Sequence, residues 1–257
     1  MTTDTTTPLP TFDHRPGRGP ALVLLHYWGG SARTWTPLLD HLGDRETVGI
    51  DTRGWGRSRA LPGPFDLHRL ADDTAAVIES LGLADYVVVG HSMGGKVAQV
   101  LAARHPAGLR GLVLVAPAPA RPADEVTPAY QAQLATAYDS AESVAGVRDA
   151  VLTATALPGE LGTQVVEDSL ASGSEYARTE WPLRGIAEDV SAETARIGVP
   201  VLVVAGEHDR VEPVAVVQAH LMPFLQHGRL TVLRGSGHLV PLEAPAELAR
   251  AIAAFLD

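Results

Sequence analysis

The chain has 257 residues, 46% of them hydrophobic, which is enough for one large folded domain or for a core with an insertion, and which excludes general disorder. Its formal net charge of −10 argues against binding to nucleic acid or to an anionic membrane, because both favour a basic surface, and it favours small, neutral or weakly polar partners. The absence of cysteine excludes disulfides, thiolate metal sites and cysteine nucleophiles.

The sequence carries no recognisable targeting or membrane-spanning signal. Its first ten residues, MTTDTTTPLP, lack both a basic region and an apolar region. No stretch reaches the roughly 18 to 20 apolar residues that a membrane span requires. We therefore expect a soluble, cytoplasmic protein with a frayed polar N-terminus.

Apolar runs alternate with helical periodicities along the first third of the chain. In order, the sequence predicts an edge hairpin within 8–20, a strand at 21–25, a helix at 34–42, a strand at 47–50 and a helix at 67–81. In the last of these, Leu67, Leu70 and Thr74 recur at helical spacing, and Asp66 stands where an N-cap is required. Alternation of this kind indicates a parallel sheet with right-handed crossovers and helices on both faces.

The stretch at 85–99, DYVVVGHSMGGKVAQ, carries the strongest functional signal. An aromatic and β-branched run at 86–89 leads into G-x-S-x-G, formed by Gly90, Ser92 and Gly94, before a helix-forming segment begins. A sharply bent position between strand and helix tolerates almost no bulk two residues to either side, and glycine meets that requirement. The alternative is a glycine-rich turn with an incidental serine, but the strand-turn-helix context favours a nucleophile at the tip of the turn.

A long segment without strand character then interrupts the alternation. After a helix at 96–105 and a strand at 111–115, residues 121–197 are typical of several short helices broken by glycine and proline. The alternation resumes with a strand at 199–205, a helix at 214–221, a strand at 229–233 and a closing helix at 246–256. We therefore predict one α/β core formed by 1–120 and 198–257, with 121–197 inserted into it as a helical lid.

Two loops at later strand ends supply partners for a serine nucleophile. Asp209 follows the strand at 199–205, and His238 follows the strand at 229–233. Because the carboxyl ends of parallel strands lie at one edge of a sheet, both side chains are expected near Ser92. A serine hydroxyl requires a base, and that base requires a carboxylate to fix its tautomer. The chain order Ser, Asp, His agrees with one known arrangement of these three residues.

Five segments in one order carry a family resemblance: LLHYWGGS at 24–31, DTRGWGRS at 51–58, GHSMGG at 90–95, VLVVAGEHD at 201–209 and GSGHLVPLEAP at 235–245. With these segments the sequence resembles the α/β-hydrolase superfamily, and within it the capped esterase and cofactor-free haloperoxidase-like branch. The resemblance implies the α/β-hydrolase fold, with a mostly parallel twisted sheet and the lid inserted after the sixth strand. It also implies Ser92 as nucleophile, His238 as general base and then acid, and Asp209 as the orienting carboxylate.

The oxyanion hole is expected to use the backbone N–H of Met93, the residue after the nucleophile. By resemblance to the family's H-G-x-G pattern, the second donor is Trp28. Tyr27 stands where the family usually has glycine, and a tyrosine with positive φ carries a steric cost. We therefore expect either a differently shaped loop or backbone strain at Tyr27.

Pocket residues are predicted on both sides of the site. The candidates are Tyr27, His26, His91, Leu134, Tyr138, Trp181 and Leu239, with Val147, Val151, Leu152, Leu157 and Tyr176 as further residues that face either the pocket or the lid's own core. His26 is interpreted either as a polar tether or as a lining residue, and His91 as a packed elbow residue rather than a second base. Glu207, His208 and Asp51 are interpreted as residues that shape their loops.

These residues predict a serine hydrolase that cleaves a carboxylic ester or lactone of a small to medium, largely apolar substrate through an acyl-enzyme on Ser92. The same triad on the same fold also supports a perhydrolase, a C–C hydrolase or a hydroxynitrile lyase. A second alternative, which is not primarily an enzyme, is a receptor-like hydrolase relative that binds a ligand and whose lid engages a partner protein. No metal or organic cofactor is expected, because the triad accounts for the clustered His and Asp residues.

Overall fold

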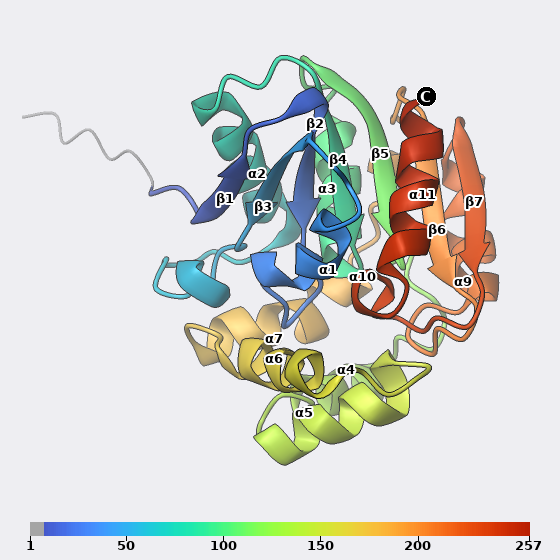
Figure 1. Ribbon diagram of the computed structural model, residues 1–257. Coiled ribbons are helices and arrows are strands. Elements are labelled where there is room, and N and C mark those ends of the chain that lie inside the picture. The colour runs from blue at the N-terminus through green and yellow to red at the C-terminus, as the bar shows by residue number, and fades with distance from the viewer. Residues whose placement is uncertain (1–7) are drawn as a thin grey trace, which may run out of the picture.

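A seven-stranded sheet runs through the computed structural model, which describes residues 8–257 (Figure 1). Residues 1–7, most of the N-terminal segment expected to be frayed, lie outside the described residues. The strand order is β1-β3-β2-β4-β5-β6-β7, and only β1 runs antiparallel to its neighbour. The strands are β1 (Phe12–Arg15), β2 (Arg18–Leu25), β3 (Arg45–Ile50), β4 (Tyr86–His91), β5 (Leu109–Val115), β6 (Val201–Gly206) and β7 (Gly228–Leu233).

The central strand β4 is buried along its whole length, which explains its unbroken apolar run. Successive side chains of a strand point to opposite faces. Val88 accordingly packs in one apolar cluster with Val97, whereas Val87 and Val89 pack in a second cluster with Leu248. In register, Val88 lies beside Val23 of β2 and Leu112 of β5. Two hydrophobic layers therefore hold the sheet from both sides.

Helices cover both faces of the sheet, as the alternation predicts. In Figure 1, α11 lies in front of the sheet and α2 and α3 lie behind it. The N-cap predicted for α2 is present, because Asp66 Oδ1 accepts from the backbone N–H of Arg69 at 2.8 Å. The helices of the core are η1 (Ala32–Trp35), α1 (Thr36–Leu39), η2 (Gly56–Ser58), α2 (Leu67–Ser80), α3 (Met93–Ala102), α9 (Val214–His220), η5 (Met222–Phe224), α10 (Val240–Glu243) and α11 (Pro245–Leu256).

The N-terminal hairpin predicted within 8–20 is wrong in its pairing. β1 pairs with β3, not with β2, since both edges of β2 are already occupied by β3 and β4. Residues 18–20 form the beginning of β2 rather than a separate strand. The insertion therefore follows the fifth strand of this sheet and not the sixth.

Between β5 and β6 the described chain contains helices and no strand. Figure 1 shows α4, α5, α6 and α7 gathered below the sheet, at the end to which the arrow of β6 points. Among residues 8–257, no helix combines the length and the apolar character needed to cross a membrane. The inserted elements are α4 (Pro128–Ala135), α5 (Ala141–Val147), the π-helical turn η3 (Arg148–Leu152), α6 (Gly159–Leu170), α7 (Glu175–Leu183), η4 (Gly185–Ala187) and α8 (Ser191–Thr194).

Candidate active site

Ser92 lies at the sharp turn between β4 and α3. Its backbone has φ 53° and ψ −116°, a conformation that a non-glycine residue adopts only under constraint. A Cβ on Gly90 would lie 2.4 Å from the backbone oxygen of Gly94, and a Cβ on Gly94 would lie 2.5 Å from that of Leu25. Both glycines are therefore required by close approach of the backbone. Helix α3 begins at Met93, three residues earlier than the sequence predicts, so its N-terminus directly follows Ser92.

The loops after β6 and β7 bring Asp209 and His238 to Ser92. The Nε2 of His238 lies 2.9 Å from the Oγ of Ser92, and its Nδ1 lies 2.9 Å from the Oδ2 of Asp209. All three side chains are buried. With Nδ1 donating to the carboxylate, Nε2 accepts the serine proton, which is the tautomer that a general base requires.

The second oxygen of Asp209 is also satisfied. Its Oδ1 accepts from the backbone N–H groups of Val211 at 2.8 Å and Glu212 at 2.9 Å. Burial alone would raise the pKa of Asp209, but the nearby His238 and these hydrogen bonds outweigh it and hold the pKa below its usual value. The carboxylate is therefore ionised and fixed in orientation.

His91 packs behind the site and does not line the cavity. Its Nε2 donates to the backbone oxygen of His238 at 2.8 Å, while its Nδ1 has no hydrogen-bond partner within residues 8–257. Burial, followed by the proximity of His238, lowers the pKa of His91 to about 3. The ring is thus neutral near pH 7 and acts as a hydrogen-bond donor to the backbone beside the base.

The loop after β2 carries Trp28, the expected second oxyanion donor. Of the two alternatives expected at Tyr27, the structure has the differently shaped loop, because the left-handed φ of this loop, 87°, falls on Gly29 and not on Tyr27. A Cβ on Gly29 would lie 2.3 Å from the ring of Tyr138. Glycine is therefore required at Gly29 and not at Tyr27. The loop is therefore shaped so that tyrosine is accommodated without strain.

Residues of the insertion hold this loop in place. The hydroxyl of Tyr138 donates to the backbone oxygen of Trp28 at 3.0 Å, and the two rings stack at 4.0 Å. Ser169 donates from Oγ to the backbone oxygen of Gly29 at 3.1 Å. The indole Nε1 of Trp28 donates to the backbone oxygen of Arg178 at 2.9 Å. These contacts with the insertion thus fix the orientation of the loop's peptide groups.

A cavity of about 60 Å³ lies against Ser92 and His238. It is lined mainly by apolar and aromatic side chains, and four predicted pocket residues are among them: Tyr27, Leu134, Tyr138 and Trp181. The further candidates Val147, Val151 and Leu152 also line it. Leu157 and Tyr176 do not, and Tyr176 is 75% exposed.

His26 and Leu239 do not line this cavity either. His26 is a buried tether: its Nδ1 donates to the backbone oxygen of Tyr27 at 2.7 Å, and its Nε2 accepts from the N–H of Thr52 at 3.0 Å. Burial lowers the pKa of His26, which agrees with an uncharged ring in this role. Leu239 belongs to an apolar cluster with Leu242 that also includes Tyr27 and Leu152 of the cavity wall.

Sequence reasoning missed four residues of the lining: Tyr130, Ile186, Val211 and Glu212. Tyr130 and Ile186 come from the insertion, where the apolar periodicity does not distinguish an inward side chain from one that packs in the insertion. Val211 and Glu212 lie two and three residues after Asp209 in the chain. Their position in a loop at the same sheet edge was the one available signal.

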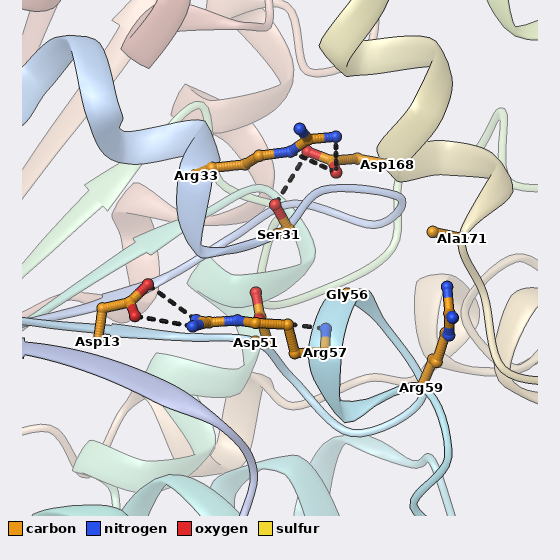
Figure 2. A pocket seen from close by; sticks show the side chains of 9 residues that line it. All are labelled: Asp13, Ser31, Arg33, Asp51, Gly56, Arg57, Arg59, Asp168 and Ala171. Carbon is orange, nitrogen blue, oxygen red and sulfur yellow. Dashed lines mark hydrogen bonds and ion pairs between the residues drawn. The ribbon is translucent and has the colours of Figure 1, made fainter.

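A larger hollow of about 700 Å³ contains neither Ser92 nor His238 (Figure 2). Its charged side chains, with the exception of Arg59, form ion pairs with one another. Arg57 contacts Asp13 and Asp51, and Arg33 contacts Asp168. Asp51 also accepts from the N–H of Ala32 at 2.7 Å, which ties two loops together. These contacts connect loops, and the hollow lies apart from Ser92 and His238, so the candidate site is the cavity at Ser92.

Comparison with known proteins agrees with the geometry. A family model described as alpha/beta hydrolase fold matches residues 20–245. The chain is 30% identical over 244 residues to 3-oxoadipate enol-lactonase 2 of Acinetobacter baylyi, which covers 92% of this chain and 88% of that protein. It is 31% identical over 248 residues to pimeloyl-[acyl-carrier protein] methyl ester esterase of Chromobacterium violaceum, which covers 87% and 95%. A solved esterase from Exiguobacterium antarcticum has a TM-score of 0.86 at 22% identity and covers 95% and 94%.

Proposed function

The chain belongs to the α/β-hydrolase family, and from that premise we propose that it is a serine hydrolase that cleaves a carboxylic ester or lactone. The observation that carries the proposal is the unbroken chain of hydrogen bonds from Ser92 through His238 to Asp209, each 2.9 Å long, beside an apolar cavity. Similarity to an enol-lactonase and a methyl ester esterase supports the same reaction class.

In the proposed reaction, Ser92 Oγ attacks the substrate carbonyl while His238 Nε2 takes its proton. Asp209 keeps the imidazole in the required tautomer and stabilises its charged form. The C–O bond then breaks, and His238 returns the proton to the leaving oxygen. A water molecule then attacks the acyl carbonyl while His238 takes its proton. The bond to Ser92 Oγ breaks, His238 returns the proton to Ser92, and the acid is released.

Two backbone N–H groups stabilise the oxyanion in this proposal. Met93 is the first residue of α3, so its N–H has no acceptor within the helix and lies at the positive end of the helix dipole. Trp28 provides the second N–H from the loop after β2. The contacts of Tyr138 and Ser169 with that loop support a preorganised donor, because donors that are already oriented cost no rearrangement during the reaction.

We further infer that residues 121–197 act as a lid over the site. Leu134, Tyr138 and Trp181 belong to this insertion and line the cavity beside Ser92. Their apolar and aromatic character favours a small to medium, largely apolar substrate. The small cavity volume agrees with a short group next to the reacting carbonyl.

The test is the hydrolysis of p-nitrophenyl acetate, p-nitrophenyl butanoate and a simple lactone by wild type and Ser92→Ala. We expect the variant to lose at least about 10³-fold in kcat/KM with an unchanged circular dichroism spectrum. Ser80→Ala, at the exposed end of α2, is the matched control. A fluorophosphonate probe should label wild type and Ser80→Ala but not Ser92→Ala. Undiminished turnover by Ser92→Ala would refute the assignment.

A further inference from the structure

Glu212 places a carboxyl group in the wall of the cavity beside Ser92. The residue is 6% exposed. Its backbone N–H donates to Asp209 Oδ1 at 2.9 Å, so the loop holds it three residues after that carboxylate. Within residues 8–257, its own carboxyl oxygens form no hydrogen bond and no ion pair. These oxygens are not fully enclosed by protein atoms, so a partner from outside the chain can reach them from the cavity.

The nearest buried cation does not serve as that partner. Lys96 Nζ donates to the backbone oxygens of Gly185 at 3.2 Å and Ile186 at 3.3 Å, and it lies over the ring of Trp181. It is not within ion-pair distance of Glu212. Burial, then the charge of Asp209, raise the pKa of Glu212 well above its ordinary value. The neutral acid can both donate and accept a hydrogen bond.

A second cavity of about 320 Å³ also has Glu212 in its wall. Four residues belong to the walls of both cavities: Tyr130, Ile186, Val211 and Glu212. The outer cavity is otherwise lined mostly by apolar side chains, including Pro119, Pro122, Ala123, Val126, Pro213 and Val216. Its volume is several times that of the inner cavity, so it is the larger apolar compartment near the reacting centre.

We propose that Glu212 is a specificity-determining residue that hydrogen-bonds to a carbonyl group placed between the reacting ester and an apolar chain. The reacting ester occupies the inner cavity, and the apolar chain occupies the outer one. The substrate class is therefore an ester or lactone of an oxo-acid or amide-containing acid with an apolar tail. This inference rests on the function proposed above.

The experiment compares p-nitrophenyl octanoate with its 4-oxo, 5-oxo and 6-oxo analogues, which differ from it only by a carbonyl in place of a methylene. We expect wild type to prefer at least one oxo ester by about tenfold in kcat/KM, because a site built to pair a polar group discriminates against the analogue that lacks it. Glu212→Met, which keeps length but cannot pair, should bring that ratio to within about twofold of one. Glu212→Gln, which retains an N–H donor, should keep a preference.

Glu79→Leu, on the exposed side of α2, is the control for loss of a carboxylate and should retain the wild-type ratio. If Glu212→Met fails to fold by circular dichroism, Glu212→Ala provides the same comparison. The proposal is overturned if wild type prefers no oxo ester, or if the preference survives in the apolar variant.

Calorimetry of the binding of the same esters to the Ser92→Ala variant separates this inference from the proposed function. If wild type hydrolyses none of the esters, the proposed function fails. In that case the inference is supported if Ser92→Ala binds an oxo ester with a Kd about tenfold lower than that of the plain ester, and if this preference is lost in the double variant Ser92→Ala/Glu212→Met. It falls if the oxo and plain esters have equal Kd values.

Discussion

The Nε2 of His91 donates a hydrogen bond to the backbone oxygen of His238 at 2.8 Å. His91, which directly precedes Ser92, thus holds the backbone of His238, whose ring contacts the Ser92 hydroxyl. The two rings are tilted against each other with centroids 5.3 Å apart. The elbow and the loop after β7 are therefore coupled directly through a buried imidazole, independently of the hydrogen bond between Ser92 and His238.

This buried imidazole predicts a loss of stability in acid. Burial lowers the pKa of His91 to about 3, whereas its ordinary value is 6.5. Between these values the unfolded chain binds a proton that the folded protein does not, so the free energy of unfolding falls as pH falls below 6.5. From pH 7.5 to pH 5 the loss from this residue is about 2 kcal/mol. Urea denaturation should show a shallower acid dependence for His91→Gln, and an identical dependence would contradict the prediction.

The hydroxyl of Tyr138 predicts an effect on kcat. Tyr138→Phe removes the 3.0 Å hydrogen bond to Trp28 and leaves that backbone oxygen unpaired, while the stacked ring remains. Because the loop then orients its N–H less firmly, we expect kcat to fall by about tenfold with KM changed by less than about twofold. Tyr176→Phe, at an exposed tyrosine in the same insertion, should match wild type. Equal kcat values for Tyr138→Phe and wild type would show that the contact is not used.

Two carboxylates in the loop after β6 should differ sharply in their effects. Asp209→Asn still reaches His238 but favours the wrong tautomer, so kcat should fall by roughly 10³ to 10⁴-fold. Glu207 is exposed; its Oε2 accepts from the N–H of Gly235 at 2.9 Å and lies 3.6 Å from Nε2 of His208. Glu207→Gln should stay within about threefold of wild type. Steady-state kinetics on p-nitrophenyl butanoate measures both, and a reversed order would move the orienting role from Asp209 to Glu207.

The core strands and the elbow are predictable because their signals are local. A strand buried on both faces must be apolar throughout, as in Val87, Val88 and Val89, and a turn without space for a Cβ must contain glycine, as at Gly90 and Gly94. The α/β-hydrolase fold is confirmed by the family match. The roles of the site residues stay predictions.

Features that depend on distant partners are not predictable in this way. The pairing of β1 depends on which edge of β2 and β3 is free, and periodicity does not contain that information. The left-handed residue of the loop after β2 is Gly29 rather than Tyr27, because the ring of Tyr138 packs where a Cβ would otherwise lie. In the sequence Glu212 is a plain polar loop residue, and only the structure shows that it lines two cavities.

The contact between the insertion and the loop after β2 predicts a loss of stability when Asp168 is changed. Asp168 is buried and accepts from Ser31 Oγ at 2.9 Å and from Arg33 Nε at 2.8 Å (Figure 2). Asp168→Ala removes the acceptor of the buried Ser31 hydroxyl and one of the two charge partners of the half-exposed Arg33, so the free energy of unfolding should fall by about 1 to 3 kcal/mol.

Glu167→Ala supplies the control for this change, because it removes an exposed carboxylate that pairs with the same Arg33 at 2.9 Å. Exposed pairs contribute little, so its effect should be below about 0.5 kcal/mol. Urea denaturation of the two variants measures the difference. Asp168→Ala should also lower kcat, since Ser31 follows Gly29 and Gly30 in the loop that holds Trp28. Equal losses of stability in the two variants would show that Asp168 acts as an ordinary surface charge and does not hold the insertion against this loop.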